Sequence, residues 1–222
     1  LGQGLCQGIK DVYNLHWKLD GVLKGKYANK VLDTYSNERI SIVKSVTETA
    51  IKHGGVIGTQ NKYIALIRDT LLNVARIFPK LLSFFDFYHP WQITNGLIDK
   101  SLYPNKANGI VISQPNLDLK VDNKSFDQYI GYNFTLIVFD QNEKLLNDIK
   151  ALESSRIFEN NIYLINEDSL FNKDSNFIKW RKDNNISAVI IRPDKHVYGC
   201  CDNESMITKV DELNKKLISE LT

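Results

Sequence analysis

The sequence of 222 residues predicts an α/β protein with a helical first half and a mixed second half. In the first half, apolar residues recur at helical spacing in three successive stretches. Beyond about Asn133, short runs of β-branched and aromatic residues alternate with helical patterns, which is typical of a sheet with crossover helices. A hydrophobic content of 43% is ample for a buried core.

Three helices are expected in the first half. The first should bury one face, formed by Ile9, Val12, Leu15, Leu19, Val22 and Leu23. The second carries Val31, Tyr35, Ile42, Val46 and Ala50, and should stop at Gly54-Gly55, since glycine readily adopts the left-handed conformation of a C-cap. The third carries Ile64, Ile67, Leu71, Val74 and Phe78 and ends at Pro79. Residues 84–115, rich in aromatic and turn residues, are expected to connect the two halves and to pack onto the helices.

The second half should contain four strands, at 134–139, 162–165, 188–191 and 197–200, and helices near 143–152, 176–182 and 204–221. The resulting order, βαβαββα, is similar to the core of a thioredoxin-like domain, with Pro193-Asp194 as the turn between the last two strands. The thioredoxin CxxC would stand at the end of the first strand, where this sequence has Asp140-Gln141-Asn142-Glu143 and therefore no thiolate nucleophile. We expect two domains, residues 1–105 and 106–222, the second without redox activity.

Composition excludes several function classes. The chain has 28 basic and 26 acidic residues, and this balance favours neither nucleic acid nor an anionic membrane as a partner. No apolar run reaches the ~20 residues needed to cross a bilayer. Three cysteines without CxxC spacing indicate a reducing, cytoplasmic setting. The four histidines lack metal-ligand spacing and stand beside no recognisable nucleophile, so neither a metal site nor a catalytic residue is expected in this chain.

Chemistry is expected at the glycine-rich segment that precedes the first helix. Gly2, Gly4 and Gly8 form a loop that opens the helix, and backbone N–H groups at a helix N-terminus attract electron-rich ligands. By itself the pattern is a weak signal, because most glycine-rich loops of this kind simply turn the chain into a buried helix.

The whole string GQGxCxGxxDxxNLxWKL, from Gly2 to Leu19, closely resembles the second flavin-binding motif of the FAD-dependent aromatic hydroxylases, including the 3-(3-hydroxyphenyl)propionate hydroxylase branch. The segment from Leu32 to Arg39 is similar to the LLDTYxxER segment of the same family. Towards the C-terminus, Arg192-Pro193-Asp194 resembles the appended domain of the phenol hydroxylase and hydroxyphenylpropionate hydroxylase branches. The resemblance implies FAD as cofactor, NAD(P)H as reductant and hydroxylation of a small phenolic substrate. It also implies that Gly2, Gln3, Gly4, Leu5 and Cys6 line the pyrimidine end of the flavin ring.

Other residues of these segments have structural expectations. Asp11 and Asn14 should bond backbone or neighbouring loops, and Trp17 should lie in the core. Glu38 and Arg39 could pair with protein outside this chain, although a solvated face is the commoner fate of charged residues. Cys200 and Cys201 alternate along a strand, so one buried and one exposed free thiol is expected.

The family's N-terminal GxGxxG fingerprint is not found in this sequence. We therefore expect a C-terminal fragment, the end of an FAD-binding domain followed by the thioredoxin-like domain, that is inactive alone. Two alternatives remain: a non-catalytic interaction module, in which the second domain forms a homodimer, or the second subunit of a split flavoprotein that docks onto a separate N-terminal FAD-binding half.

Overall fold

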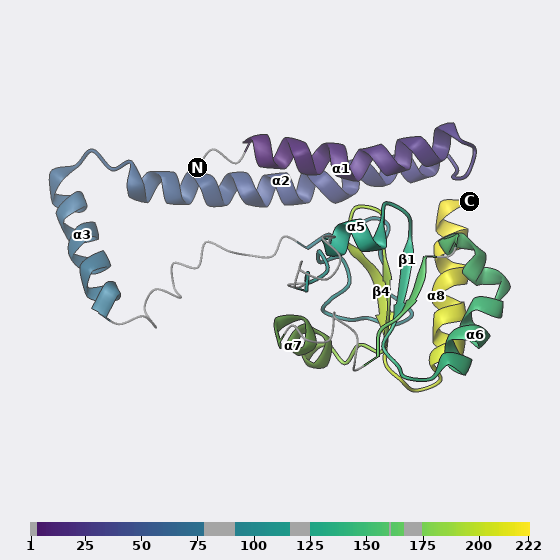
Figure 1. Cartoon of the computed structure of the whole chain (residues 1–222). Coiled ribbons are helices and arrows are strands. Elements are labelled where there is room, and N and C mark those ends of the chain that lie inside the picture. The colour runs from purple at the N-terminus through teal and green to yellow at the C-terminus, as the bar shows by residue number, and fades with distance from the viewer. Residues whose placement is uncertain (1–3, 78–91, 116–124, 160, 167–174) are drawn as a thin grey trace.

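The computed structural model describes residues 4–77, 92–115, 125–159, 161–166 and 175–222. Figure 1 shows two parts: a long helical hairpin that continues into a third helix, and an α/β domain below it. The hairpin pairs α1 (Gly4–Leu23) with α2 (Lys30–Ile57), and α3 (Lys62–Ile77) projects away from the α/β domain. The expected Phe78 and Pro79 at the end of the third helix lie outside the described residues, as does much of the expected connector.

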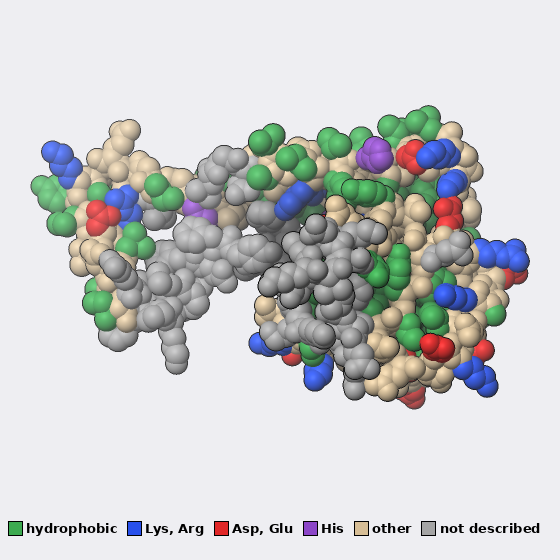
Figure 2. Space-filling view, in the orientation of Figure 1, with side chains coloured by type: hydrophobic (Ala, Val, Ile, Leu, Met, Phe, Trp, Pro, Cys, Tyr) green, Lys and Arg blue, Asp and Glu red, His purple; other side chains and the backbone are tan. Residues whose placement is uncertain are grey.

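The expected buried face of the first helix is wrong. Ile9, Val12 and Leu23 on this face are exposed, whereas the residues of α1 that lie against the rest of the chain are Gln7, Asn14, Trp17, Lys18 and Gly21. An apolar stripe predicts a buried face only if the chain itself supplies the partner surface, and α1 turns its polar side to this chain. Figure 2 shows hydrophobic side chains along the outer side of the hairpin.

The second helix buries the predicted face. Val31, Ile42 and Val46 are buried, and the last two pack with Ile93 and Ile98 of the segment that follows α3. The helix does not stop at Gly54-Gly55 but continues to Ile57, and Gly58 caps it by donating its N–H to the carbonyl of Gly54. Two glycines inside the last turn lower helix stability without ending the helix.

Four strands form one sheet in the order β2-β1-β3-β4, with β1 (Thr135–Val138) in its middle. Strand β1 pairs in parallel with β2 (Ile162–Leu164) and antiparallel with β3 (Ala188–Ile191). Strand β3 also pairs antiparallel with β4 (Val197–Cys201). The parallel pair requires a crossover connection, and α6 (Glu143–Ala151) supplies it.

Helices cover both faces of the sheet. On one face lie α6, the short 3₁₀ helix η2 (Glu153–Phe158) and α8 (Met206–Leu221), which packs its buried stripe of leucines against the strands. On the other face lie α5 (Phe126–Ile130) and α7 (Ser175–Asp183), each with a buried phenylalanine. Because both faces are covered, β1, β3 and β4 read as continuous buried runs rather than alternating ones.

Residues 92–112 run along the open edge of β4 and join the two parts of the molecule. Hydrogen bonds link the N–H of Asp99 to the carbonyl of Tyr198 and the N–H of Gly109 to the carbonyl of Val197. Gly109 adopts a φ of 81°, and a Cβ there would lie 2.1 Å from the carbonyl oxygen of Ile93, so no side chain fits this close approach.

The predicted order of elements in the second half is confirmed, including the turn at Pro193-Asp194. Two short elements, α5 and η2, were not predicted. At the end of β1, Asp140 accepts hydrogen bonds from backbone N–H groups, and Asn142 caps α6. The thioredoxin-like assignment of this domain and the domain boundary after residue 105 stay predictions.

Candidate functional site

The predicted flavin-facing residues lie at the beginning of α1. Gly2 and Gln3 lie outside the described residues, and Gly4, Leu5 and Cys6 form the first turn. The helix begins at Gly4 rather than after Gly8, so the predicted loop is shorter than expected. Leu5 is 77% exposed, and Cys6 is an exposed free thiol.

The first turn of α1 carries backbone N–H groups that the helix itself leaves without acceptors. The first four N–H groups of an α-helix have no acceptor within the helix, and no acidic side chain lies in this turn to neutralise them. A Cβ built on Gly4 or Gly8 would meet no heavy atom within 4 Å, so the packing of the described residues does not itself require glycine there. Gln7 is buried beside this turn, and its Nε2 has no acceptor among the described residues.

Arg39 of α2 fixes the same end of α1. Its Nε donates to Asp11 at 2.6 Å and its Nη2 donates to Oε1 of Gln7 at 2.9 Å. Arg39 is buried, and Asp11 bonds a side chain of the neighbouring helix rather than a loop. These contacts hold the first two turns of α1 in place while leaving the outer side open.

A buried ionic cluster lies further along α1, and Glu38 of α2 stands at its centre. Oε1 of Glu38 accepts from Nη1 of Arg192 at 2.9 Å and from the N–H of Leu97 at 2.8 Å. Oε2 accepts from Nη2 of Arg192, from Nζ of Lys18 and from Nδ2 of Asn14, at 2.7 to 2.8 Å. Both Glu38 and Lys18 have side chains with no exposed surface.

Arg192 uses all five of its N–H donors within this cluster. Besides Glu38, it donates to Oδ1 of Asp194 at 3.0 Å, to Oδ2 of Asp194 at 2.7 Å and to the carbonyl of Leu97 at 2.9 Å. Asn14 also donates to Asp194, at 2.9 Å. A buried guanidinium is tolerated because each of its donors meets an acceptor and two carboxylates balance its charge.

The cluster changes the pKa values of its members in line with their surroundings. Burial alone would raise the pKa of Glu38, but Arg192 and Lys18 outweigh it and lower that pKa to about 2. Burial also opposes ionisation of Asp194, and Arg192 together with His196 nevertheless holds its pKa below the ordinary value. Burial and the nearby Arg192 lower the pKa of Lys18 to about 8.

We interpret the ionic cluster as a joint between the helical hairpin and the α/β domain. Its members come from α1, from α2, from the segment before β1 and from the turn between β3 and β4. Sequence reasoning placed the partners of Glu38 and Arg39 outside the chain or in solvent, and this is wrong: both side chains are paired within it. Trp17 is buried as predicted, with the guanidinium carbon of Arg192 at 5.4 Å from its ring centroid.

The two adjacent cysteines of β4 do not form a reactive site. Cys200 and Cys201 point to opposite faces of the sheet as predicted, but both are buried, because helices cover both faces. Burial raises the pKa of both thiols, that of Cys201 to about 12. The expected exposed thiol at this pair is therefore wrong.

The described part of the chain contains neither a candidate metal site nor a candidate membrane span. Within it, no group of three or more His, Cys, Asp or Glu side chains is placed to hold a metal ion. Among the same residues, none of the helices has both the length and the apolar character that a bilayer crossing requires.

Two segments of the chain match known families. Residues 1–50 match the family described as FAD binding domain, and residues 109–216 match the HcaD C-terminal domain. A 3-(3-hydroxy-phenyl)propionate/3-hydroxycinnamic acid hydroxylase of Mycolicibacterium smegmatis is 30% identical over 151 residues, which are 65% of this chain and 27% of that protein. Its counterpart in Mycolicibacterium vanbaalenii is 24% identical over 220 residues, or 90% of this chain and 39% of the relative. The chain thus spans between about a quarter and two fifths of the length of these relatives.

Solved structures share the fold. The flavin-dependent monooxygenase PieE, solved in complex with FAD and substrate, aligns with a TM-score of 0.67 at 17% identity over 99% of this chain and 45% of its own. The anhydrotetracycline hydroxylase OxyS from Streptomyces rimosus aligns with a TM-score of 0.62 at 18% identity over 100% of this chain and 42% of its own. The two family matches and the curated relatives show that the chain is similar to FAD-dependent aromatic hydroxylases, and the solved structures show that it shares the fold of flavin-dependent monooxygenases.

Proposed function

We propose that this chain forms part of an NAD(P)H-dependent aromatic hydroxylase and contributes one wall of its FAD site. The substrate is a small phenolic compound, as in the hydroxyphenylpropionate hydroxylases to which the chain is similar. The observation that carries the proposal is the first turn of α1, which lies within the FAD-binding match. It combines N–H groups that have no acceptor within the helix with Gly4, where a Cβ would meet no heavy atom within 4 Å.

The residues present fit such a cofactor. FAD is rich in hydrogen-bond acceptors, and it would meet the N–H groups of the turn that contains Gly4, Leu5 and Cys6, preceded by Gly2 and Gln3. The Nε2 of Gln7, which has no acceptor among the described residues, offers one more donor. When bound, FAD supplies the redox and oxygen chemistry, while this chain supplies positive potential at the helix end, worth roughly 0.3 to 1 kcal/mol or somewhat more if partly buried.

The apolar outer side of α1 supports a second part of the proposal. Leu5, Ile9 and Val12 are exposed at the flavin-facing end, and α3 exposes Ile64, Ile67 and Leu71. Exposed apolar stretches of this extent mark interaction surfaces. We infer that the remaining FAD-binding part of the enzyme packs here, whether it belongs to the same polypeptide or to a separate subunit, and that this chain alone neither retains FAD nor hydroxylates a phenol.

The test compares this chain alone with the chain joined behind the N-terminal part of the M. smegmatis relative. We expect no flavin absorbance from the chain alone, and both flavin absorbance and phenol-stimulated NAD(P)H oxidation from the joined protein. Stoichiometric flavin on the chain alone would overturn the claim that the rest of the protein is needed.

A matched pair of variants in the joined protein tests the flavin-facing turn itself. Gly4 and Gly54 both lie in helices, and a Cβ at either meets no heavy atom within 4 Å. Gly4→Val should weaken FAD binding, whereas Gly54→Val should leave it unchanged. Equal FAD affinity in the two variants would refute a role for the turn at Gly4.

A further inference from the structure

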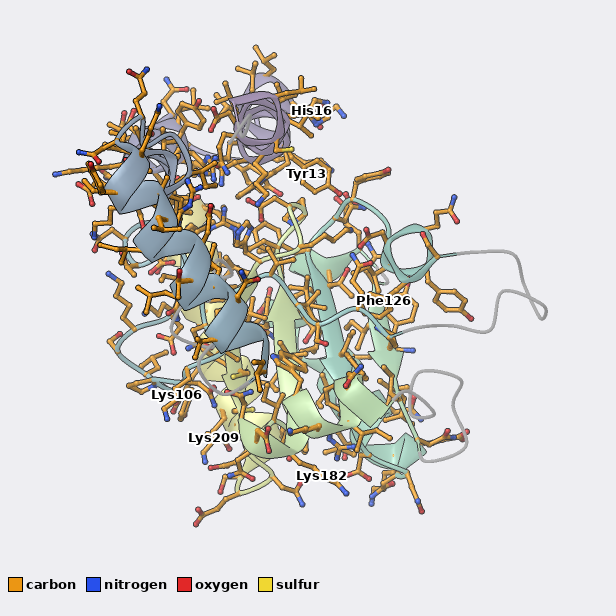
Figure 3. The ribbon with its side chains drawn as sticks, turned by 90° about the vertical axis from the view of Figure 1, so that its left-hand side faces the viewer. Tyr13, His16, Lys106, Phe126, Lys182 and Lys209 are labelled. Atoms are coloured by element: carbon orange, nitrogen blue, oxygen red, sulfur yellow. The ribbon has the colours of Figure 1, made fainter. Side chains whose placement is uncertain are left out.

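The beginning of α1 has little packing of its own against this chain. Within residues 4–12, Gln7 is the only buried residue, and Asp11 is half-buried. From Tyr13 onward the α/β domain also holds the helix, since the ring of Tyr13 meets that of Tyr132 edge to face with centroids 6.4 Å apart. In Figure 3, Tyr13 lies on the side of α1 that faces the α/β domain. The first two turns lie before this support begins.

The sequence of these two turns does little to keep them helical. Gly4 and Gly8 fall within them, and only proline favours a helix less than glycine does. The first turn contains no acidic side chain to complement the helix dipole. Without a contact from outside the helix, this end of α1 should therefore fray.

Arg39 of α2 supplies that contact to both turns at once. Its Nε donates to Oδ1 of Asp11 at 2.6 Å, and its Nη2 donates to Oε1 of Gln7 at 2.9 Å. Gln7 and Asp11 stand four residues apart, so their side chains lie on the same face of α1. A planar guanidinium suits two acceptors placed in this way, because its N–H donors have fixed directions. One side chain thus joins the first two turns of α1 to α2.

Arg39 is itself held in place by its surroundings. It is 4% exposed, and the residue before it, Glu38, is fixed by two hydrogen bonds from Arg192. Burial, and the charge of Arg39 in addition, lower the pKa of Lys10. The carboxylate of Asp11 balances the charge of Arg39, so its removal would leave two cations to repel each other at this end of α1.

We propose that Arg39 is a positioning residue for FAD, which keeps the first two turns of α1 helical and so aligns the N–H groups of the turn at Gly4. This inference rests on the proposed function and adds to it a residue that acts through α1. Arg39 is buried and its charge is balanced by Asp11, so it contributes geometry rather than a free positive charge. Donors that are aligned in advance stabilise charge on a ligand better than donors that must first be ordered.

A first experiment follows amide hydrogen exchange in this chain without FAD. Asp11→Ala removes one acceptor of Arg39 at a half-buried position, so the chain should still fold. Alanine favours a helix more than aspartate does, so propensity alone would slow exchange. We instead expect the amides of residues 8–13 to exchange about tenfold faster, because a charge-assisted hydrogen bond is lost, and those of residues 17–23 to stay unchanged.

Asp20→Ala is the matched control. It makes the same substitution near the other end of α1, where Asp20 forms an exposed pair with Lys24. It should leave exchange at residues 8–13 as in the wild type.

A second experiment measures FAD affinity and the reduction potential of bound FAD in the protein that joins this chain to the N-terminal part of the M. smegmatis relative. It compares Asp11→Ala with Arg39→Lys, which keeps the charge but loses the planar fork. Both variants should bind FAD about several-fold more weakly and make its potential more negative, because a frayed helix end presents less positive potential to the electron-rich reduced flavin. A merely structural role would lower the fraction of folded protein without moving the potential of the flavin that stays bound.

The outcomes separate this inference from the proposed function. Equal exchange at residues 8–13 in Asp11→Ala and Asp20→Ala would show that Arg39 does not order the turns. FAD bound with equal affinity and potential by the wild type and both joined variants would overturn the role of Arg39 alone. If the joined wild type retains no FAD, the proposed function fails, and the role of Arg39 towards FAD fails with it.

Discussion

The α/β domain and the three helices before it differ in where their apolar side chains lie. In the α/β domain, both faces of the sheet are covered and the stripe of α8 is buried. In α1 and α3 the apolar side chains are largely exposed. The side of α1 that lies against the rest of the chain instead carries Asn14, Lys18 and other polar groups. The α/β domain thus carries its own core, and the hairpin is attached to it both by the ionic cluster and by Trp17 and Val31, which pack into that core. Much of the apolar surface of α1 and α3 stays exposed.

Removal of Arg192 should have the largest effect on the free energy of unfolding, because Arg192 pairs with carboxylates of both regions, Glu38 of α2 and Asp194 of the α/β domain. Arg192→Met leaves the buried carboxylates of Glu38 and Asp194 without their main cation, and breaking a buried pair in this way costs about 3 to 5 kcal/mol. Chemical denaturation measures the loss as a fall in the free energy of unfolding. Arg156→Met is the matched control, since the pair of Arg156 with Glu153 is exposed and 3.7 Å long. Similar losses in both variants would show that the joint does not depend on the ionic cluster.

Truncation of one leucine in each region tests the comparison directly. Leu217 of α8 is fully buried, and Leu217→Ala should lower the free energy of unfolding by about 2 to 5 kcal/mol. Leu71 of α3 is 59% exposed, and Leu71→Ala should change it by less than about 0.5 kcal/mol. If Leu71→Ala proves as costly as Leu217→Ala in the isolated chain, then α3 is already packed, for instance in a homodimer, and light scattering would detect that dimer.

The sequence predicted the α/β domain well because its signals are local. Strand 188–191 is a short β-branched run and strand 197–201 a short, mostly apolar run; both lie between turn residues, and their bounds agree with the prediction to within one residue. The exposure of Cys200 or Cys201 was predicted wrongly, since alternation along a strand gives the direction of a side chain but not whether a helix covers that face.

Sequence patterns could not predict the ionic cluster, for a different reason. Arg192 and Glu38 are 154 positions apart, and local sequence patterns do not indicate contacts between residues so far apart. The wrong face assigned to α1 has a related cause: helical periodicity identifies an apolar stripe but not the protein surface that covers it. The flavin-facing residues from Gly2 to Cys6 were predicted from resemblance, and they stay a prediction.

The smallest expected effect concerns Lys18 and pH. The pKa of Lys18 in the folded chain is about 8, below its ordinary value of 10.5, so the folded state binds this proton more weakly than the unfolded state does. Below pH 8 both states hold the proton and the ammonium is buried at a cost. As pH rises from about 8 towards 10.5, the folded state loses the proton first and that cost disappears. The difference in free energy of unfolding between the wild type and Lys18→Met should therefore move in favour of the wild type over this range.

The comparison with Lys18→Met matters because other groups titrate in the same window. Burial also raises the pKa of Cys201 to about 12, which lowers the stability of the fold above pH 9 and partly hides the effect of Lys18 in the wild type alone. Both proteins contain Cys201, so its contribution cancels when their free energies of unfolding, measured by denaturation at a series of pH values, are subtracted. If the Lys18→Met difference stays constant from about pH 8 to 10.5, the ammonium of Lys18 is stabilised by Glu38 as fully as it is by water, and burial of this charge costs the fold nothing.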